Sequence, residues 1–136
     1  GTGTLSLPLA HLFSNVYGIE INEAAVKNAE MNAFKNNISN VNYLANTLKK
    51  GLKDIVELGR PDVLIFDPPR CGVGAKLLKK IMDIAPQKIV YVSCNPTTMA
   101  SDINILSEEY RLVEVTPVDM FPHTYHLETV THLIKK

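Results

Sequence analysis

The stretch KIVYVSCNPTTMASDINIL, residues 88–106, decides the fold because a buried strand is followed directly by a helix. The apolar run KIVYVS (88–93) is typical of a strand that is covered on both faces. Asn95 can cap a helix and Pro96 suits the first helical position, so we expect a helix from there to about Leu106. Cys94 stands at the corner between the two elements, where a buried valine or a plain turn residue would serve the fold.

The same alternation of strand and helix extends on both sides of this stretch. Strands are predicted over residues 15–20, 41–46 and 62–67, and helices over 5–13, 22–35, 47–58 and 75–85. The strand DVLIFD (62–67) is a continuous apolar run of the kind that is buried on both faces. Two successive strands, in YRLVEVTPVDM and ETVTHLI, complete the chain. This order predicts an α/β fold with a doubly wound, mostly parallel sheet whose last strand is antiparallel.

Composition favours one compact domain. The chain has 136 residues, 46% hydrophobic and 21% charged, and no apolar run near the roughly 18–20 residues of a membrane span. Two cysteines are too few for a secreted disulfide scaffold, and the N-terminus of the chain is not a signal peptide, so we expect a cytoplasmic protein. The net charge is zero, which gives no electrostatic sign of a nucleic-acid partner.

The chain opens on GTGTLSLPLA, residues 1–10. A Gly-x-Gly turn ordinarily joins a strand to a helix, and no strand stands before this one. We therefore expect residues 1–136 to be one domain of a longer protein, truncated at the N-terminus so that the first strand is missing.

Four reactive side chains are expected at one edge of the sheet. Ligands of such sheets bind beyond the carboxyl ends of the parallel strands. Glu20, Asp67 and Cys94 each close a parallel strand, and Glu128 begins the antiparallel one, which starts where the others finish. The sequence therefore predicts a functional site at this edge.

Glu20 and Asp67 can each be interpreted either as a ligand-binding residue or as an ordinary structural residue. Glu20 follows the glycine turn at about the spacing of a residue that binds a ribose diol, although a solvated carboxylate near a helix N-terminus would look the same. Asp67 precedes Pro68 and Pro69, which would stiffen the strand exit and fix the direction of the carboxylate. Asp-Pro is also an ordinary strand-terminating turn.

The cysteines and histidines are candidates for a nucleophile or for metal ligands, and the sequence favours only Cys94. Backbone N–H groups at the start of the following helix would favour a Cys94 thiolate, whereas an unreactive cysteine is ordinarily buried. Cys71 lies in a glycine-flanked loop and is interpreted as incidental. His123, His126 and His132 have no cysteine or carboxylate cluster beside them, so no metal site is expected.

Together, these segments resemble the S-adenosylmethionine (SAM)-dependent RNA 5-methyluridine (uracil-C5) methyltransferases. The resemblance covers essentially the whole chain and matches the C-terminal catalytic domain of that family, which has a Rossmann-like class I methyltransferase fold. GTGT resembles the end of its cofactor loop, VYGIEINEAAVKNAEMNA its ribose-binding segment and DPPR its central-strand motif. VSCNPTTMASD resembles its nucleophile motif and MFPHTYHLETV its general-base motif, and these two are the specific ones.

The resemblance implies roles for five residues. Thr4, Glu20 and Asp67 would contact SAM, while Cys94 would be the nucleophile and Glu128 the proton acceptor. The implied reaction transfers a methyl group to C5 of a uridine in RNA through a covalent adduct between Cys94 and C6 of the base. The family's RNA-binding N-terminal region, which carries iron–sulfur cysteines in some members, is absent from residues 1–136.

Several alternatives stay open. FPHT-x-HLE looks more like the 23S ribosomal-RNA members than the transfer-RNA members. An N-methyltransferase acting on exocyclic amines also places an acidic or amide residue before Pro-Pro, but usually has an aromatic residue where Arg70 stands. A non-catalytic nucleotide-binding module would need neither Cys94 nor Glu128. The sequence leaves the oligomeric state open.

Overall fold

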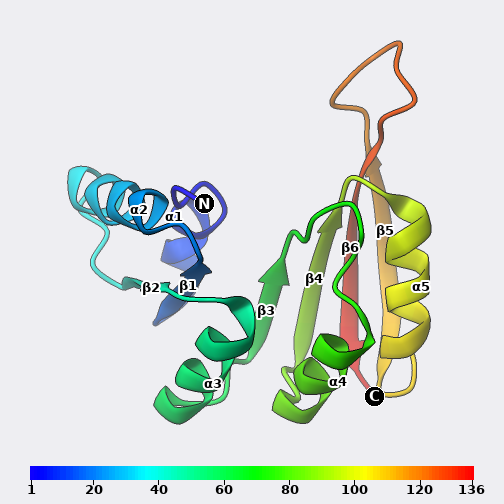
Figure 1. Cartoon of the computed structure of the whole chain (residues 1–136), viewed down its shortest axis with the longest axis horizontal. Coiled ribbons are helices and arrows are strands. Elements are labelled where there is room, and N and C mark those ends of the chain that lie inside the picture. Colours follow the sequence, from blue (N-terminus) through cyan, green and yellow to red (C-terminus); the bar gives the residue numbers. More distant parts are fainter. The chain divides into compact units, whose positions relative to one another are not determined.

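The structure, a computed structural model, describes residues 1–136. The chain divides into two compact units, residues 1–59 and 60–136, each with its own sheet (Figure 1). No strand pairing joins the two sheets. No helix has the length and apolar character that crossing a membrane requires.

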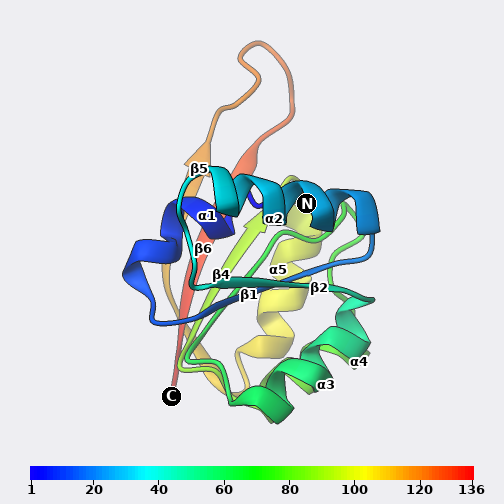
Figure 2. The same cartoon turned by 90° about the vertical axis from the view of Figure 1, so that its left-hand side faces the viewer.

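The first unit is a two-stranded parallel sheet with helices. Its elements are α1 (Ser6–Leu9), the 3₁₀ helix η1 (Ala10–Leu12), β1 (Val16–Glu20), α2 (Glu23–Lys35), β2 (Val41–Ala45) and α3 (Leu48–Leu58). The strands pair in parallel from Val16 with Val41 to Glu20 with Ala45. Figure 2 shows α2 running alongside these two strands, and α2 contacts both of them.

Helix α2 begins and packs as its sequence predicts. The Asn22 side chain accepts hydrogen bonds from the backbone N–H groups of Ala24 and Ala25, at 2.9 and 3.2 Å. These bonds satisfy donors that the first turn leaves without partners, so the helix begins after Asn22. The buried residues recur at helical spacing along the face of α2: Val26, Ala29 and Ala33.

The second unit is a four-stranded mixed sheet with two helices. Its elements are β3 (Val63–Phe66), α4 (Ala75–Ile84), β4 (Lys88–Ser93), α5 (Pro96–Leu106), β5 (Tyr110–Val118) and β6 (Glu128–Lys135). The strand order is β3-β4-β6-β5, with β3 and β4 parallel and β6 antiparallel to both of its neighbours. The prediction that the last strand is antiparallel is therefore confirmed.

The core of the second unit lies on one face of β4 and β6. Alternate residues of these strands are buried, as the two-residue period of a strand requires. They are Ile89, Tyr91 and Ser93 of β4 and Thr129, Thr131 and Leu133 of β6. The helices contribute Leu78 and Ile81 from α4 and Met99 and Leu106 from α5.

Two details of the expected elements are wrong. The helix expected over residues 5–13 is α-helical only to Leu9 and continues as the 3₁₀ turn η1, with Pro8 tolerated because it lies in the first turn. The strand expected over 62–67 is shorter, and only Phe66 of its four residues is fully buried. Strand β3 has one hydrogen-bonded neighbour, so it is an edge strand of its sheet. The expectation of a preceding, missing strand stays a prediction.

Candidate active site

The register of β4 and β6 makes Cys94 and Glu128 neighbours. Ser93, the last residue of β4, pairs with Thr129, the second residue of β6. Cys94 follows Ser93 and Glu128 precedes Thr129, so the two residues adjoin across neighbouring antiparallel strands. Both side chains are partly accessible, since Cys94 and Glu128 are of intermediate exposure. The register therefore places Cys94 and Glu128 at adjacent strand positions in the second unit, and the role expected for each stays a prediction.

A set of hydrogen bonds fixes the corner on which Cys94 stands. The Ser93 hydroxyl accepts from the Asn95 N–H at 3.0 Å and donates to the Asn95 carbonyl at 3.1 Å. The Asn95 side chain accepts from the N–H groups of Thr97 and Thr98, at 3.2 and 3.5 Å. Cys94 is thus held between two residues whose backbone and side chains are tied down.

These bonds correct one expectation about Cys94. The N–H groups at the start of α5 were expected to be available to a thiolate. Asn95 uses the two from Thr97 and Thr98, and Pro96 has none. What α5 offers Cys94 is the field of its N-terminus rather than direct hydrogen bonds.

Asp67 lies at the same edge, directly after β3. Phe66 pairs with Tyr91 of β4, so Asp67 and Cys94 leave adjacent parallel strands at the same end. Asp67 is exposed and no hydrogen bond from the protein reaches its carboxylate, while partial desolvation raises the pKa of this group above the ordinary value of 3.8. Both oxygens are therefore free to accept hydrogen bonds from a ligand.

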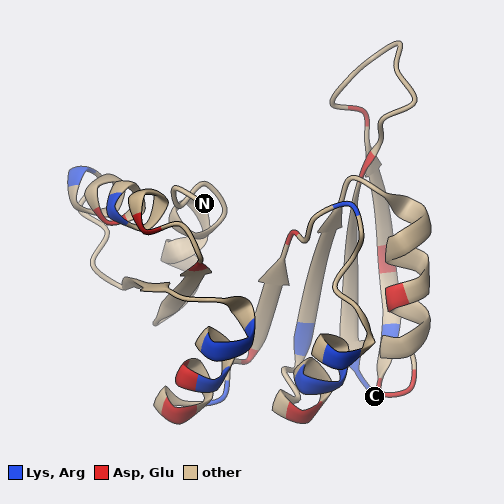
Figure 3. Ribbon diagram, in the orientation of Figure 1, with Lys and Arg blue, Asp and Glu red and all other residues tan.

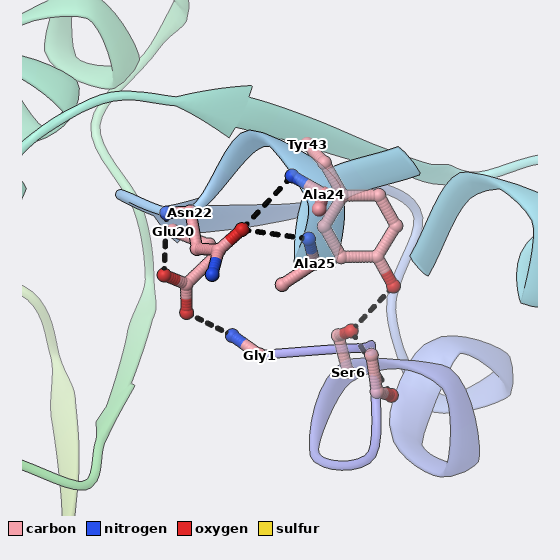
Figure 4. Close-up of polar contacts among 8 residues, drawn as sticks. Gly1, Ser6, Glu20, Asn22, Ala24, Ala25 and Tyr43 are labelled. Carbon is pink, nitrogen blue, oxygen red and sulfur yellow. Dashed lines mark hydrogen bonds and ion pairs between the residues drawn. The ribbon is translucent and has the colours of Figure 1, made fainter. Parts of the chain in front are cut away.

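Glu20 and Thr4 belong to the first unit. The Glu20 carboxylate accepts from the Asn22 N–H at 2.8 Å and contacts the Gly1 ammonium group (Figure 4). Thr4 is exposed in the turn that leads into α1.

The turn containing Gly3 is fastened to β2 by Tyr43. The hydroxyls of Ser6 and Tyr43 lie 2.7 Å apart, and Ser6 also donates to the Gly3 carbonyl at 3.3 Å (Figure 4). Gly3 has φ +92, and a Cβ there would lie 2.7 Å from the Tyr43 hydroxyl oxygen. The Tyr43 ring also covers Gly18, where a Cβ would lie 2.6 Å from it. Tyr43 therefore leaves no room for a side chain at Gly18, whereas at Gly3 the positive φ and Leu7, whose Cδ1 would lie 2.8 Å from a Cβ, add to the restriction.

The structure brings Asp67, Cys94 and Glu128 together at one edge of the second unit. The expected convergence of Glu20 with these three stays a prediction. The ionisable and cysteine side chains do not form a group of three or more that could hold a metal ion.

Basic charge is not concentrated in the loop that leads to Glu128. Figure 3 shows basic segments on α3 and α4, whereas the long loop between β5 and β6 carries none. That loop, residues 119–127, reads DMFPHTYHL and exposes Phe121 and Tyr125.

Sequence reasoning missed the polar residues that hold the loop after β3. Asp102 of α5 is buried, and its carboxyl group accepts from the Tyr91 hydroxyl at 2.8 Å and the Val73 N–H at 2.7 Å. A signal was present in the sequence: Asp102 falls between Met99 and Leu106 on the apolar face of α5. An acidic residue on such a face needs a partner.

The chain resembles solved methyltransferases over nearly its whole length. The tRNA (uracil-54, C5)-methyltransferase of Pyrococcus abyssi, solved with S-adenosyl-L-homocysteine, superposes with a TM-score of 0.81 and 36% identity. The match covers 98% of this chain and 32% of that one. TrmN of Thermus thermophilus, at 17% identity and a TM-score of 0.72, covers 100% of this chain and 42% of that one and shares the fold. The fold is therefore the Rossmann-like class I SAM-dependent methyltransferase fold, with antiparallel pairing at its end.

Sequence comparison gives the family. All of residues 1–136 match the family model described as tRNA (Uracil-5-)-methyltransferase, so the chain belongs to the RNA uracil-5 methyltransferase family and represents its catalytic domain. An uncharacterized RNA methyltransferase of Enterococcus faecalis is 48% identical over 99% of this chain, and one of Streptococcus mutans is 44% identical over 99%. The chain spans 30% of the length of each of these relatives.

Proposed function

We propose that the protein of which residues 1–136 form the catalytic domain methylates C5 of a uridine in RNA, with SAM as the methyl donor. The observation that carries the proposal is the register of β4 and β6, which makes Cys94 and Glu128 neighbours across the sheet. A nucleophile and a proton acceptor at adjacent positions are the two protein groups that this reaction needs.

Cys94 is the nucleophile in this proposal. C5 of uracil is a poor nucleophile towards a methyl sulfonium, so the ring must first be activated. The Cys94 thiolate adds to C6, and the electron pair of the C5–C6 double bond moves onto the ring as an enolate with density at C5. The hydrogen bonds between Ser93 and Asn95 hold the backbone on either side of Cys94 for this attack.

Glu128 completes the reaction. SAM, when bound, would supply an electrophilic methyl group: C5 takes the methyl group as the methyl–sulfur bond breaks, and S-adenosyl-L-homocysteine is left. C5 then carries both the methyl group and its original proton. The Glu128 carboxylate removes that proton. The electron pair of the C5–H bond then restores the C5–C6 double bond as the bond between Cys94 and C6 breaks. The thiolate is regenerated, and the product is 5-methyluridine.

Thr4, Glu20 and Asp67 are the proposed contacts to SAM. Glu20, at the end of β1, accepts from the Asn22 N–H through Oε1 and would offer Oε2 to a hydroxyl of the ribose. The Asp67 carboxylate is exposed and has no hydrogen bond from the protein, so it can accept from an N–H donor of the ligand. Thr4, exposed beside the buried Gly3, offers a hydroxyl group at the turn that Tyr43 and Ser6 hold.

An RNA base is the proposed methyl acceptor. A base must leave its stack to reach a pocket of this kind, and exposed aromatic rings provide a surface for it or its neighbours. Tyr125 is 88% exposed and Phe121 54% exposed, in the loop that leads to Glu128. Because this loop carries no Lys or Arg, we propose that other parts of the longer protein supply most of the grip on the phosphates.

The RNA class is the finer part of the proposal. The segment FPHTYHLE, residues 121–128, favours 23S ribosomal RNA, and transfer RNA is the alternative substrate. An N-methyltransferase on exocyclic amines is disfavoured because it would leave Cys94 without a role and would have Arg70 at a position usually aromatic.

The experiment uses the full-length protein with SAM and two unmodified transcripts, one of 23S ribosomal RNA and one of transfer RNA. Nucleosides are then analysed by mass spectrometry. We expect 5-methyluridine in the ribosomal transcript only. Formation in the transfer RNA alone would keep the chemistry and correct the substrate, whereas methyl groups found only on exocyclic nitrogens, or none at all, would contradict the proposal.

A further inference from the structure

Asp102 is the one acidic side chain buried in the chain, with 6% of its surface exposed. It lies in the middle of α5, on the face that packs against β4. No Lys, Arg or His lies within ion-pair distance of it. A buried carboxyl group destabilises the folded state unless it is hydrogen-bonded, so the hydrogen bonds of Asp102 indicate its role.

Asp102 joins three elements through a single oxygen atom. Oδ2 accepts from the Tyr91 hydroxyl of β4 at 2.8 Å and from the Val73 N–H at 2.7 Å. Val73 belongs to the loop that runs from Asp67 to Gly74, and the bond spans 29 residues of sequence. Burial, with the adjacent Asp102 carboxyl group, raises the pKa of Tyr91, so its hydroxyl stays protonated and donates. Strand, helix and loop thus meet at one acceptor.

The start of α5 holds the other end of the same loop. The Arg70 carbonyl accepts from the Asn95 side-chain amide at 3.1 Å and from the Thr98 hydroxyl at 3.1 Å. Asn95 directly follows Cys94, so the loop that begins with Asp67 is fastened to the residue next to the proposed nucleophile. The backbone between Arg70 and Val73 is therefore attached to α5 at both ends.

Gly72 lets the backbone of the loop approach the Asp102 carboxyl group closely. Its φ is +81, in the region that favours glycine, and a Cβ there would lie 2.7 Å from Asp102 Oδ2. No larger residue fits between the loop and the carboxyl group without moving one of them. The fit between Gly72 and Asp102 is a sign that the loop position is specified.

We infer that Asp102 is a positioning residue, which locks the loop after Asp67 onto α5 and so fixes the Asp67 carboxylate relative to the Cys94 thiol. The inference rests on the proposed function, in which Asp67 contacts SAM and Cys94 attacks the base. Tyr91, which donates to Asp102, lies on the buried face of β4, as does Ser93 next to Cys94. The hydrogen bonds of Asp102 are therefore in the core. Asp102 acts through the loop and does not touch the reacting atoms.

The test compares Asp102→Ala, Asp102→Asn and Tyr91→Phe in the full-length protein, with Ser101→Ala as the control. Ser101 is exposed on the same helix, and its hydroxyl donates only to the Thr97 carbonyl within α5. Two quantities are measured: kcat per active site, with sites counted by covalent capture of 5-fluorouridine RNA, and hydrogen exchange at the Val73 amide. Counting sites separates loss of geometry from loss of folded protein.

We expect kcat per site to fall at least tenfold in Asp102→Ala, because small misplacements of reacting groups cost about that much or more. Val73 exchange should accelerate at least tenfold in the same variant. Asp102→Asn retains an oxygen that can accept both bonds and should recover most of the rate, while Ser101→Ala should match the wild type in both measurements.

If Asp102→Ala does not fold, Tyr91→Phe and Gly72→Ala decide the question, since each perturbs the same attachment while leaving Asp102 in place. Unchanged kcat per site and unchanged Val73 exchange in the folded variants would overturn the inference. Absence of methylation by the wild-type protein would count against the proposed function instead. Val73 exchange would still report on the attachment in that case.

Discussion

Ser93 and Thr129 pair at the end of β4 and the start of β6, and this pairing sets Cys94 beside Glu128. A shift of the register by one residue would turn Glu128 to the opposite face of the sheet, because side chains alternate along a strand. Buried Thr131 and Leu133 keep the register, since a slip would move both out of the core. The packing of β6 therefore controls the chemistry proposed at its first residue.

Glu128→Gln should stop the reaction after methyl transfer. The amide does not accept the C5 proton as a carboxylate does, so the methylated base stays bound to Cys94. We expect kcat to fall by about 10²–10⁴, with a protein–RNA adduct of matching mass visible by mass spectrometry. Glu114→Gln, on exposed β5, is the control and should turn over normally. Full turnover by Glu128→Gln would remove Glu128 from the mechanism.

Asp67→Asn should increase thermal stability while decreasing SAM affinity. Burial raises the pKa of Asp67 above 3.8, so the folded state holds the proton more tightly than the unfolded state. The free energy of unfolding of the wild type therefore decreases as the pH rises from about 3.8 through the folded-state pKa. Above that pKa the full cost of holding the ionised Asp67 in the folded state is present.

The measurement is the melting temperature of the wild type and Asp67→Asn at neutral pH and near pH 3.8. The gain in melting temperature should be larger at neutral pH and shrink as the pH falls. Asp62→Asn, at the exposed entry to β3, is the matched control and should show no such trend. A pH-independent difference for Asp67→Asn would show that desolvation of this carboxylate does not limit stability.

Tyr43→Phe should loosen the turn at Gly3. The ring still covers Gly18, but the hydroxyl 2.7 Å from Ser6 is lost, at a cost of about 1 kcal/mol in the free energy of unfolding. If this turn forms part of the SAM site, the Kd for SAM should rise several-fold by calorimetry. Tyr17→Phe, on β1, has a hydroxyl that makes no hydrogen bond and should leave both quantities unchanged. Equal effects of the two substitutions would argue against the role of the Tyr43 hydroxyl.

Local signals in the sequence were sufficient for most of the fold. Asn22 and Asn95 each precede a helix that begins where predicted, because an asparagine cap acts on N–H groups only two and three residues away. The strands at β4 and β6 carry apolar patterns that tertiary packing reinforces. The burial of β3 was overestimated, because it depends on which strands lie beside it and not on its own composition.

The position of the candidate site residues at one edge of the second unit could also be predicted, whereas the residues that hold this edge in place could not. Strand ends and the order of strands were enough to bring Asp67, Cys94 and Glu128 to one edge. The Asp102 attachment joins residues 29 positions apart in a loop without regular structure, and no periodicity encodes such a contact. The hydrogen bond from the Asn95 side-chain amide to the Arg70 carbonyl is another such long-range contact that no sequence pattern encodes.

The covalent step can be tested by incubating the full-length protein with SAM and 5-fluorouridine-containing RNA. Fluorine at C5 does not leave as a proton does, so a base methylated through Cys94 stays attached to the protein. We predict a stable adduct that maps to Cys94 by peptide mass spectrometry, is retained in Cys71→Ala and disappears in Cys94→Ala. Methylation without an adduct, or full turnover by Cys94→Ala, would contradict the assignment of Cys94 as the nucleophile.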